Sequence, residues 1–221
     1  MIELVNLSKK FSTPSGSNVV ADNINVTFPT GEAVGLIGRN GAGKSTLMNM
    51  IGGQIKPDSG KIERTGTISW TVGFSGSFNR DMSGAQNTKF IARVYGVDTQ
   101  ELADYVEDFA ELGPHFHVPV RNYSSGMRAR LAFGISIGIP FDTYLVDEVT
   151  AVGDAAFKRK SRIAFLDRMQ NAGAIVVNHS MGQLKKLCDS AAILENGKLT
   201  YYDDIDEAIA VHHTNMGSNE D

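Results

Sequence analysis

The sequence predicts an α/β fold with a parallel sheet, and three features of the chain indicate it. The first 70 residues are mostly strand-like, with apolar residues between turn-rich segments. A short apolar strand at residues 32–38 then runs directly into a glycine-rich loop and a helix. From about residue 98 onward, helical and strand-like segments alternate, which is the pattern that produces a parallel sheet. We therefore expect such a sheet in the second half of the chain.

The N-terminal part contains the predicted strands and one helix. Turn-rich residues 12–18 join two strands, and the loop after the third strand leads into a helix that the pair Gly52-Gly53 ends. A Lys-Pro-Asp-Ser-Gly turn then returns the chain to strand structure. The predicted strands cover residues 2–11, 19–28, 32–38 and 61–70, and the predicted helix covers residues 46–51.

The C-terminal part contains the alternating segments. A helix at residues 98–112 is predicted from its apolar face and from Asp98 and Glu101, which form a capping-box start, and Gly113-Pro114 ends it. An Asn-Gly turn predicts a hairpin over residues 190–202. The remaining expectations are helices that begin near residue 124 and at 157–170, 181–189 and 204–213, strands at 142–148 and 173–180, and a polar tail at 214–221.

Composition excludes several classes of protein. Of 221 residues, 21 are Lys or Arg and 25 are Asp or Glu, so bulk positive charge for nucleic-acid binding is absent and we expect no nucleic-acid partner. The single cysteine, Cys188, excludes an internal disulfide framework and fits a reducing, cytosolic setting. The N-terminus lacks the features of a signal peptide, and the most apolar run, residues 131–141, is about half the length that spans a bilayer.

The loop after the third predicted strand has the composition of a phosphate-binding loop. The sequence GRNGAGKST fits the pattern G-x-x-x-x-G-K-[ST], with Gly38, Gly43, Lys44 and Ser45 at the defined positions. Its glycines let the backbone curl so that the amides of residues 41–45 face one anion. We expect Lys44 to contact the outer phosphates and the Ser45 hydroxyl to bind Mg²⁺. The alternative reading is a plain glycine turn with an exposed lysine.

Three further polar side chains follow predicted strands. Asp147 and Glu148 end a buried strand, where Asp147 would hold Mg²⁺ and Glu148 would orient and deprotonate an attacking water. His179 follows the next strand and could donate to a terminal phosphate oxygen. A solvated strand end and a surface histidine are the corresponding alternatives.

Two more candidates lie outside these strands. Ser124, Ser125 and Gly126 stand where a helix begins, so backbone amides and hydroxyls form a second potential anion site. Phe11 follows the first strand and could stack on a nucleobase, or it could be a core or edge aromatic.

These motifs, in this order, resemble those of an ATP-binding-cassette (ABC) ATPase over essentially the whole chain. The phrase YSSGM at residues 123–127 resembles the family signature LSGGQ and differs from it at Tyr123, Ser125 and Met127. AVGD at residues 151–154 stands at the place of the D-loop, which is usually SALD, and His179 stands at the place of the switch histidine.

The resemblance implies a P-loop NTPase with a RecA-like parallel-sheet core, an antiparallel β subdomain and a helical signature subdomain. The whole of residues 1–221 would be one domain, with residues 1–75 and 140–221 as the core with its β subdomain and residues 76–139 as the helical subdomain. ATP and Mg²⁺ would be the cofactors. The implied nucleotide contacts are Phe11, Gly38, Arg39, Asn40, Gly41, Ala42, Gly43, Lys44, Ser45, Thr46, Ser124, Ser125, Gly126 and Asp154.

The implied mechanism has two copies of the chain sandwiching two ATP molecules, each between the phosphate loop of one copy and the signature of the other. A membrane-spanning permease would contact residues 70–82, whose apolar Trp70, Phe74, Phe78 and Met82 could equally be core residues. The family glutamine of this linking loop is missing. Asn79 stands in a similar phrase and is the candidate metal ligand in its place, and a surface loop residue is the alternative.

Longer phrases, such as YLVDEVTAVGDAAFKRK, resemble the ATPase subunits of bacterial capsular polysaccharide exporters, with O-antigen and teichoic acid exporters as the alternatives. Such a subunit sits on the cytoplasmic face of the inner membrane and would not touch the polysaccharide. We expect no carbohydrate-binding extension, because the chain ends near residue 221. Other phosphate-loop enzymes, such as a kinase or a GTPase, and a non-catalytic nucleotide-binding scaffold are the rival classes. No Asn-Lys-x-Asp phrase for guanine is present, and Glu148 argues against the scaffold.

Overall fold

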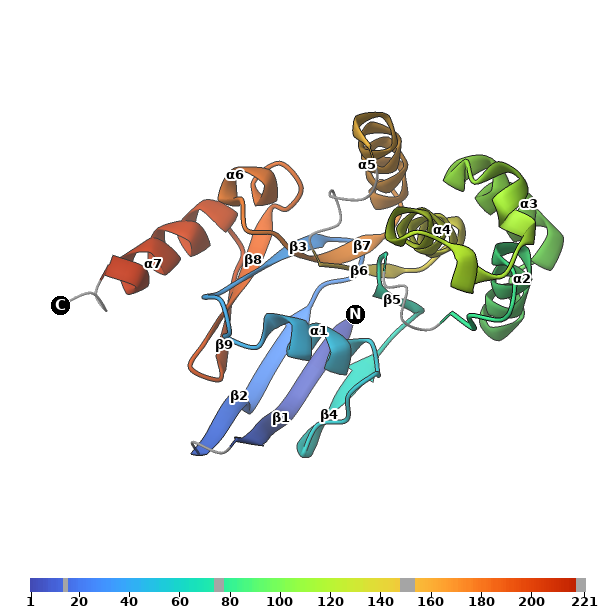
Figure 1. The fold of residues 1–221 in the computed structure, drawn as a ribbon. Coiled ribbons are helices and arrows are strands. Elements are labelled where there is room, and N and C mark those ends of the chain that lie inside the picture. The colour runs from blue at the N-terminus through green and yellow to red at the C-terminus, as the bar shows by residue number, and fades with distance from the viewer. Residues whose placement is uncertain (14–15, 74–77, 148–153, 218–221) are drawn as a thin grey trace. The chain divides into compact units, whose positions relative to one another are not determined.

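The structure, a computed structural model, describes residues 1–13, 16–73, 78–147 and 154–217. Its internal contacts divide the chain into two compact units (Figure 1). The first unit comprises residues 1–71, 141–148 and 171–221, and the second comprises residues 72–140 and 149–170. No helix within the described ranges is long and apolar enough to cross a membrane.

The first unit contains the predicted parallel sheet. Its six strands lie in the order β5-β6-β7-β3-β8-β9, and every neighbouring pair is parallel except the hairpin β8-β9. The hairpin turns at Asn196 and Gly197, which both have positive φ angles, as the Asn-Gly signal predicts. The strands are β3 (Ala33–Ile37), β5 (Ile68–Thr71), β6 (Thr143–Asp147), β7 (Gly173–Val177), β8 (Ser190–Glu195) and β9 (Lys198–Tyr202).

A second sheet in this unit is antiparallel and has the order β2-β1-β4. It is formed by the long strands β1 (Ile2–Thr13) and β2 (Gly16–Phe28) together with β4 (Ser59–Arg64). Residues 61–70, which the sequence predicts as strand, thus contribute to both sheets, since β4 belongs to one and β5 to the other. The two sheets confirm the predicted combination of a parallel core with an antiparallel β part.

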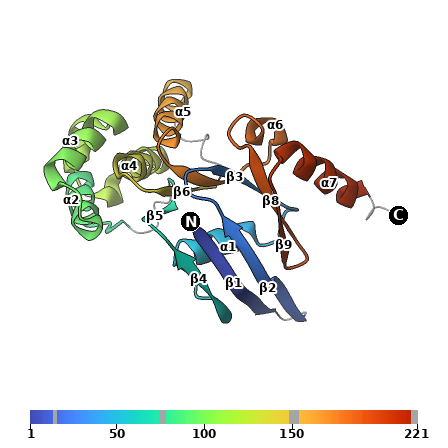
Figure 2. The ribbon, with the colours of Figure 1, turned by 180° about the vertical axis from the view of Figure 1, so that it is seen from behind.

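One helix packs against both sheets in a shared core, and two others cover the other face of the parallel sheet (Figures 1 and 2). Helix α1 (Lys44–Ile51) contributes Leu47, Met48 and Ile51 to a cluster that also holds apolar residues of both sheets. On β3, Leu36 faces this cluster, whereas a Cβ at Gly35 would point to Leu184 and Ile205. The opposite face is thus covered by α6 (Met181–Leu184) and α7 (Ile205–Gly217).

The second unit is helical and contains α2 (Gly84–Tyr95), α3 (Thr99–Ala110), α4 (Ser125–Gly138) and α5 (Ala155–Met169), with short 3₁₀ segments at Gly113–His117 and Val120–Asn122. Phe109, Phe133 and Phe157, from three of these helices, stack or meet edge to face in its core. By its contacts α5 groups with this unit, although the sequence boundaries place it in the core domain. The functional division of the chain therefore stays a prediction.

Several local features differ from the sequence expectation. Helix α7 runs to Gly217, whereas the sequence predicts a polar tail from residue 214. Helix α2 was not predicted, although a full capping box of Ser83 and Gln86 marks its start. Helix α3 ends two residues before the predicted Leu112, because Glu111 adopts a left-handed conformation with φ 52°. Helix α6 is α-helical only to Leu184, whereas the sequence predicts a helix to residue 189.

Candidate functional site

The glycine-rich loop links β3 to α1, as predicted, and its shape depends on glycine. Gly43 precedes the helix with a φ of 103°, and a Cβ there would lie 2.4 Å from Val20 Cγ1. A Cβ at Gly38 would lie 2.4 Å from the Leu194 carbonyl oxygen. Both contacts are far shorter than real Cβ contacts, so a larger residue at either position would displace the loop.

The N-terminus of α1 is arranged to bind an anion. The first intrahelical hydrogen bond runs from the Leu47 amide to the Gly43 carbonyl, so the helical amides before Leu47 have no acceptor within the helix. No side chain caps this end. Such amides, together with the helix dipole, favour negative charge and fit a phosphate group.

Lys44, the first residue of α1, holds its ammonium group over the same loop. Its Nζ donates to the carbonyl oxygens of Gly38, at 2.6 Å, and Arg39, at 3.0 Å. Burial lowers the pKa of Lys44, and the nearby charge of Asp147 partly opposes that shift. Within the loop, the Ala42 amide donates to the Arg39 carbonyl and tightens the turn.

Ser45 and Asp147 meet from different elements. The Ser45 hydroxyl, in the first turn of α1, donates to Asp147 Oδ2 at 3.0 Å, at the end of β6. A hydroxyl and a carboxylate are the hard oxygen ligands that Mg²⁺ prefers, so this pair fits the ion that the sequence predicts. Within the described residues no cluster of three or more His, Cys, Asp or Glu side chains competes with it as a metal site.

A cavity of about 530 Å³ joins these groups in the first unit. His179, which follows β7, and Phe11, at the far end of β1, line the same cavity as Lys44 and Asp147. Phe11 is 39% exposed and therefore is not a core residue, while Lys9 Nζ lies 5.2 Å from its ring centroid. The remaining lining residues are Asn18, Val20, Asn40, Gly41, Gly43, Ser45, Thr46 and Val177.

Sequence reasoning missed some of these residues. Asn18 and Val20 lie on β2, and only the pairing of β2 with β1 shows that they lie near Phe11. A neighbouring cavity of about 370 Å³ adds a contribution from α7, because His212 and Met216 line it together with Gly38, Arg39 and Asn40. Burial lowers the pKa of His212 below its usual value. Nothing in the local sequence of α7 indicates this position.

The signature segment lies in the second unit, at the start of α4. Ser124 caps the helix by accepting the Met127 amide at 3.1 Å, and Ser124, Ser125 and Gly126 are all exposed. Tyr123, which departs from the family leucine, is buried and donates its hydroxyl to the His115 carbonyl at 2.6 Å. Tyr123 therefore anchors the segment, and the polar residues after it remain accessible.

The other candidates of the second unit have local partners. Asp154 caps α5 by accepting the Phe157 amide at 2.9 Å and also accepts Arg130. Asn79, on the loop before α2, accepts the Asp81 amide with its side-chain oxygen at 3.0 Å. Their roles toward nucleotide and metal stay predictions. Glu148, Phe74 and residues 151–153 lie outside the described residues.

The fold and this constellation define a nucleotide-binding cassette. The chain matches the ABC transporter family over residues 21–151 and belongs to it. It is 47% identical to the polysialic acid transport ATP-binding protein KpsT of Escherichia coli, over 95% of each chain. It is 41% identical to the capsule polysaccharide export ATP-binding protein CtrD of Neisseria meningitidis, over 97% of this chain and 99% of that one. A dimeric ATP-binding cassette solved with ADP and phosphate shares the fold, with a TM-score of 0.74, 21% identity, and coverage of 93% and 99%.

Proposed function

We propose that the chain is the ATP-hydrolysing subunit of a capsular polysaccharide exporter. The observation that carries this proposal is the Ser45–Asp147 hydroxyl–carboxylate pair, which lines one cavity with Lys44 and His179. This geometry is typical of phosphoryl transfer from a nucleoside triphosphate. Near-complete alignment with relatives named for polysialic acid transport and capsule polysaccharide export supports the choice of exported material.

Different residues of the chain bind the phosphates, hold the metal ion and activate the attacking water. The amides at the start of α1 and the ammonium of Lys44 bind the outer phosphates of ATP, and Ser45 with Asp147 would hold Mg²⁺. When bound, Mg²⁺ neutralises charge on the phosphate oxygens. Glu148 orients a water and accepts its proton as the water oxygen bonds to the terminal phosphorus and the bond to the ADP oxygen breaks. His179 donates a hydrogen bond to a terminal phosphate oxygen.

The signature of a second copy of the chain completes the site. Support for this comes from Gly126, which has no strained φ and would have room for a methyl group, since a Cβ would meet nothing closer than Ser124 Oγ at 3.9 Å. Glycine is therefore not required at this position by the chain's own packing. A phosphate that is held on another copy of the chain and approaches Gly126 closely would explain why glycine stands at this position. The dimer forms around two ATP molecules because these contacts exist only in the closed state.

The chain acts as a peripheral subunit on the cytoplasmic face of the bacterial inner membrane. A separate permease docks on residues 70–82, of which Trp70 packs edge to face on Phe141 and Met82 is half-buried. The permease carries the polysaccharide, and this subunit supplies the free energy of ATP.

Two measurements test this function. The purified chain is expected to turn over ATP with Mg²⁺, whereas Glu148→Gln is expected to bind ATP and lose about 10²-fold or more of its turnover. In an Escherichia coli strain that lacks KpsT, expression of the chain is expected to restore surface polysialic acid, and Glu148→Gln is not. ATP turnover without restored export, despite normal expression of the chain, would support the ATPase activity and would reject the assignment to capsule export.

A further inference from the structure

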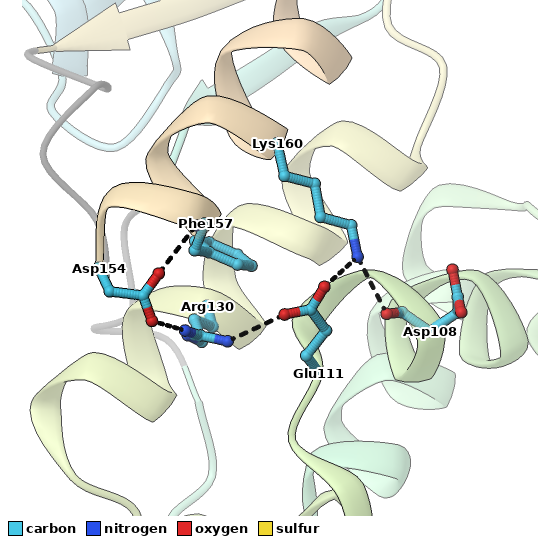
Figure 3. A network of polar contacts seen from close by, with 6 residues as sticks. All are labelled: Asp108, Glu111, Arg130, Asp154, Phe157 and Lys160. Carbon is cyan, nitrogen blue, oxygen red and sulfur yellow. Dashed lines mark hydrogen bonds and ion pairs between the residues drawn. The ribbon is translucent and has the colours of Figure 1, made fainter.

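Arg130 lies at the centre of a charge network that connects three helices of the second unit (Figure 3). It projects from α4, six residues after Ser124, and its guanidinium contacts two carboxylates. One nitrogen lies 2.7 Å from Asp154 Oδ2, at the start of α5, and the other lies 3.4 Å from Glu111 Oε2, at the end of α3. Lys160, on α5, also binds Glu111, through Oε1 at 2.7 Å, and reaches the Asp108 carbonyl.

The guanidinium also rests on an aromatic ring. Its Cζ lies 4.4 Å from the centroid of the Phe157 ring, which is buried at the start of α5. Lys160 makes a similar contact with Phe109 at 5.0 Å. Two cations thus lie over the aromatic core that α3, α4 and α5 share, and a cation over a ring adds attraction to that of the ion pairs.

The Arg130–Asp154 pair is shielded from water on the arginine side. The Arg130 side chain is only 19% exposed, so its charge is screened less by water than that of a fully solvated arginine. The Asp154 side chain is 64% exposed, and each of its carboxylate oxygens has a partner within the unit, because Oδ1 caps α5 and Oδ2 accepts Arg130. One carboxylate therefore fixes both the start of α5 and its position against the signature helix.

We propose that Arg130 is a positioning residue for ATP hydrolysis, which holds the signature helix α4 against Asp154 so that Ser124 and Gly126 meet the partner copy's nucleotide in one orientation. This inference rests on the proposed function. Asp154 then acts through Arg130 and through its cap rather than as a ligand of the nucleotide. Because misplacing a catalytic group by about 1 Å can cost about 10²-fold in rate, loss of the pair is expected to affect turnover more than ATP binding.

The test uses the full-length chain and compares Arg130→Met with Asp154→Asn. Methionine keeps much of the apolar stem and removes the charge, whereas asparagine keeps a good helix cap and removes only the ionic partner of Arg130. Each is expected to lower kcat by about 10-fold to 10²-fold while the KM for ATP changes less than about twofold. Arg130→Lys is expected to recover part of kcat, since lysine keeps the charge but not the fork that reaches both carboxylates.

The double variant shows whether the two residues act together. If the pair is the functional unit, Arg130→Met with Asp154→Asn is expected to be no slower than the worse single variant. The matched control is Arg121→Met, which removes an exposed arginine–aspartate pair with Asp81 at 2.9 Å from the same unit and is expected to leave kcat unchanged. All assays are run well below the melting temperature of each variant, so that loss of stability alone does not lower kcat.

Three outcomes would overturn the inference. Wild-type kcat in both single variants, additive losses in the double variant, or an equal loss in Arg121→Met would each remove Arg130 from this role. A wild-type chain that does not turn over ATP, with Lys44→Ala giving the same background, would instead reject the proposed function, and this inference with it.

Discussion

The Ser45 hydroxyl lies 3.0 Å from Asp147 Oδ2, although the two residues stand 102 positions apart in the chain. Helix α1 presents the first, and the end of the buried strand β6 presents the second. Both residues line the cavity that Lys44 and Gly43 also line, so under the proposed function the pair would hold a divalent cation beside the phosphates and would link metal binding to nucleotide binding.

Asp147→Asn tests this link. The amide keeps the shape and can still accept the Ser45 hydroxyl, but it loses the charge that attracts Mg²⁺. Calorimetry is expected to show ATP affinity without metal within about twofold of the wild type, and loss of the affinity gained from Mg²⁺, with turnover down by about 10²-fold or more. Retention of full Mg²⁺-dependent turnover in this variant would remove Asp147 from the metal site.

The sequence alone predicts the phosphate loop well, because its residues are contiguous and its glycines are required locally by the turn. Asp147 and His179 are also predictable, since carboxyl ends of neighbouring parallel strands meet at one sheet edge, and β6 and β7 are neighbours. Asn18, Val20 and His212 were not predicted. They reach the cavities only through the pairing of β2 with β1 and the packing of α7 on the sheet, which are long-range contacts without a local signal.

The helical unit was predictable in part. The serine cap of α4 and the Asp98 cap of α3 follow from local chemistry and are present. The Arg130 network was not predicted, because it joins residues 111, 130, 154 and 160 from three elements. Sequence patterns give the identity of such charges and not their partners.

Cys188 offers a check on the packing of the first unit. It is buried, and burial raises the pKa of its thiol to about 12. The native protein holds this proton more tightly than the unfolded chain, so the contribution of Cys188 to stability is complete below about pH 9 and is lost as the pH rises toward 12. At pH 8, Ellman's reagent is expected to modify the thiol only after denaturation. Rapid stoichiometric reaction of the folded chain would contradict this burial.

Gly126→Ala separates stability from function at the signature. Alanine has room in the chain and is the better helix former by up to about 1 kcal/mol, so the melting temperature is expected to stay or rise. Hydrolysis is expected to fall, because the added methyl group faces the phosphate held by the partner copy. Thermal melting and steady-state turnover measure the two effects. A variant that is both more stable and fully active would show that nothing approaches Gly126 from outside the chain.

Mixing Ser124→Arg chains with Lys44→Ala chains tests the composite site most directly. Each variant alone is expected to be inactive. Lys44→Ala loses the ammonium that binds the phosphates in its own phosphate loop, and in Ser124→Arg the larger side chain obstructs the nucleotide bound to the partner copy. A mixed dimer contains one site with both defects and one site with neither. We expect ATP turnover to reappear on mixing, toward the level that a wild-type and Lys44→Ala mixture gives in its mixed dimers. A mixture that stays inactive while that control retains activity, or a Ser124→Arg monomer that no longer binds ATP, would contradict a site completed by the second copy.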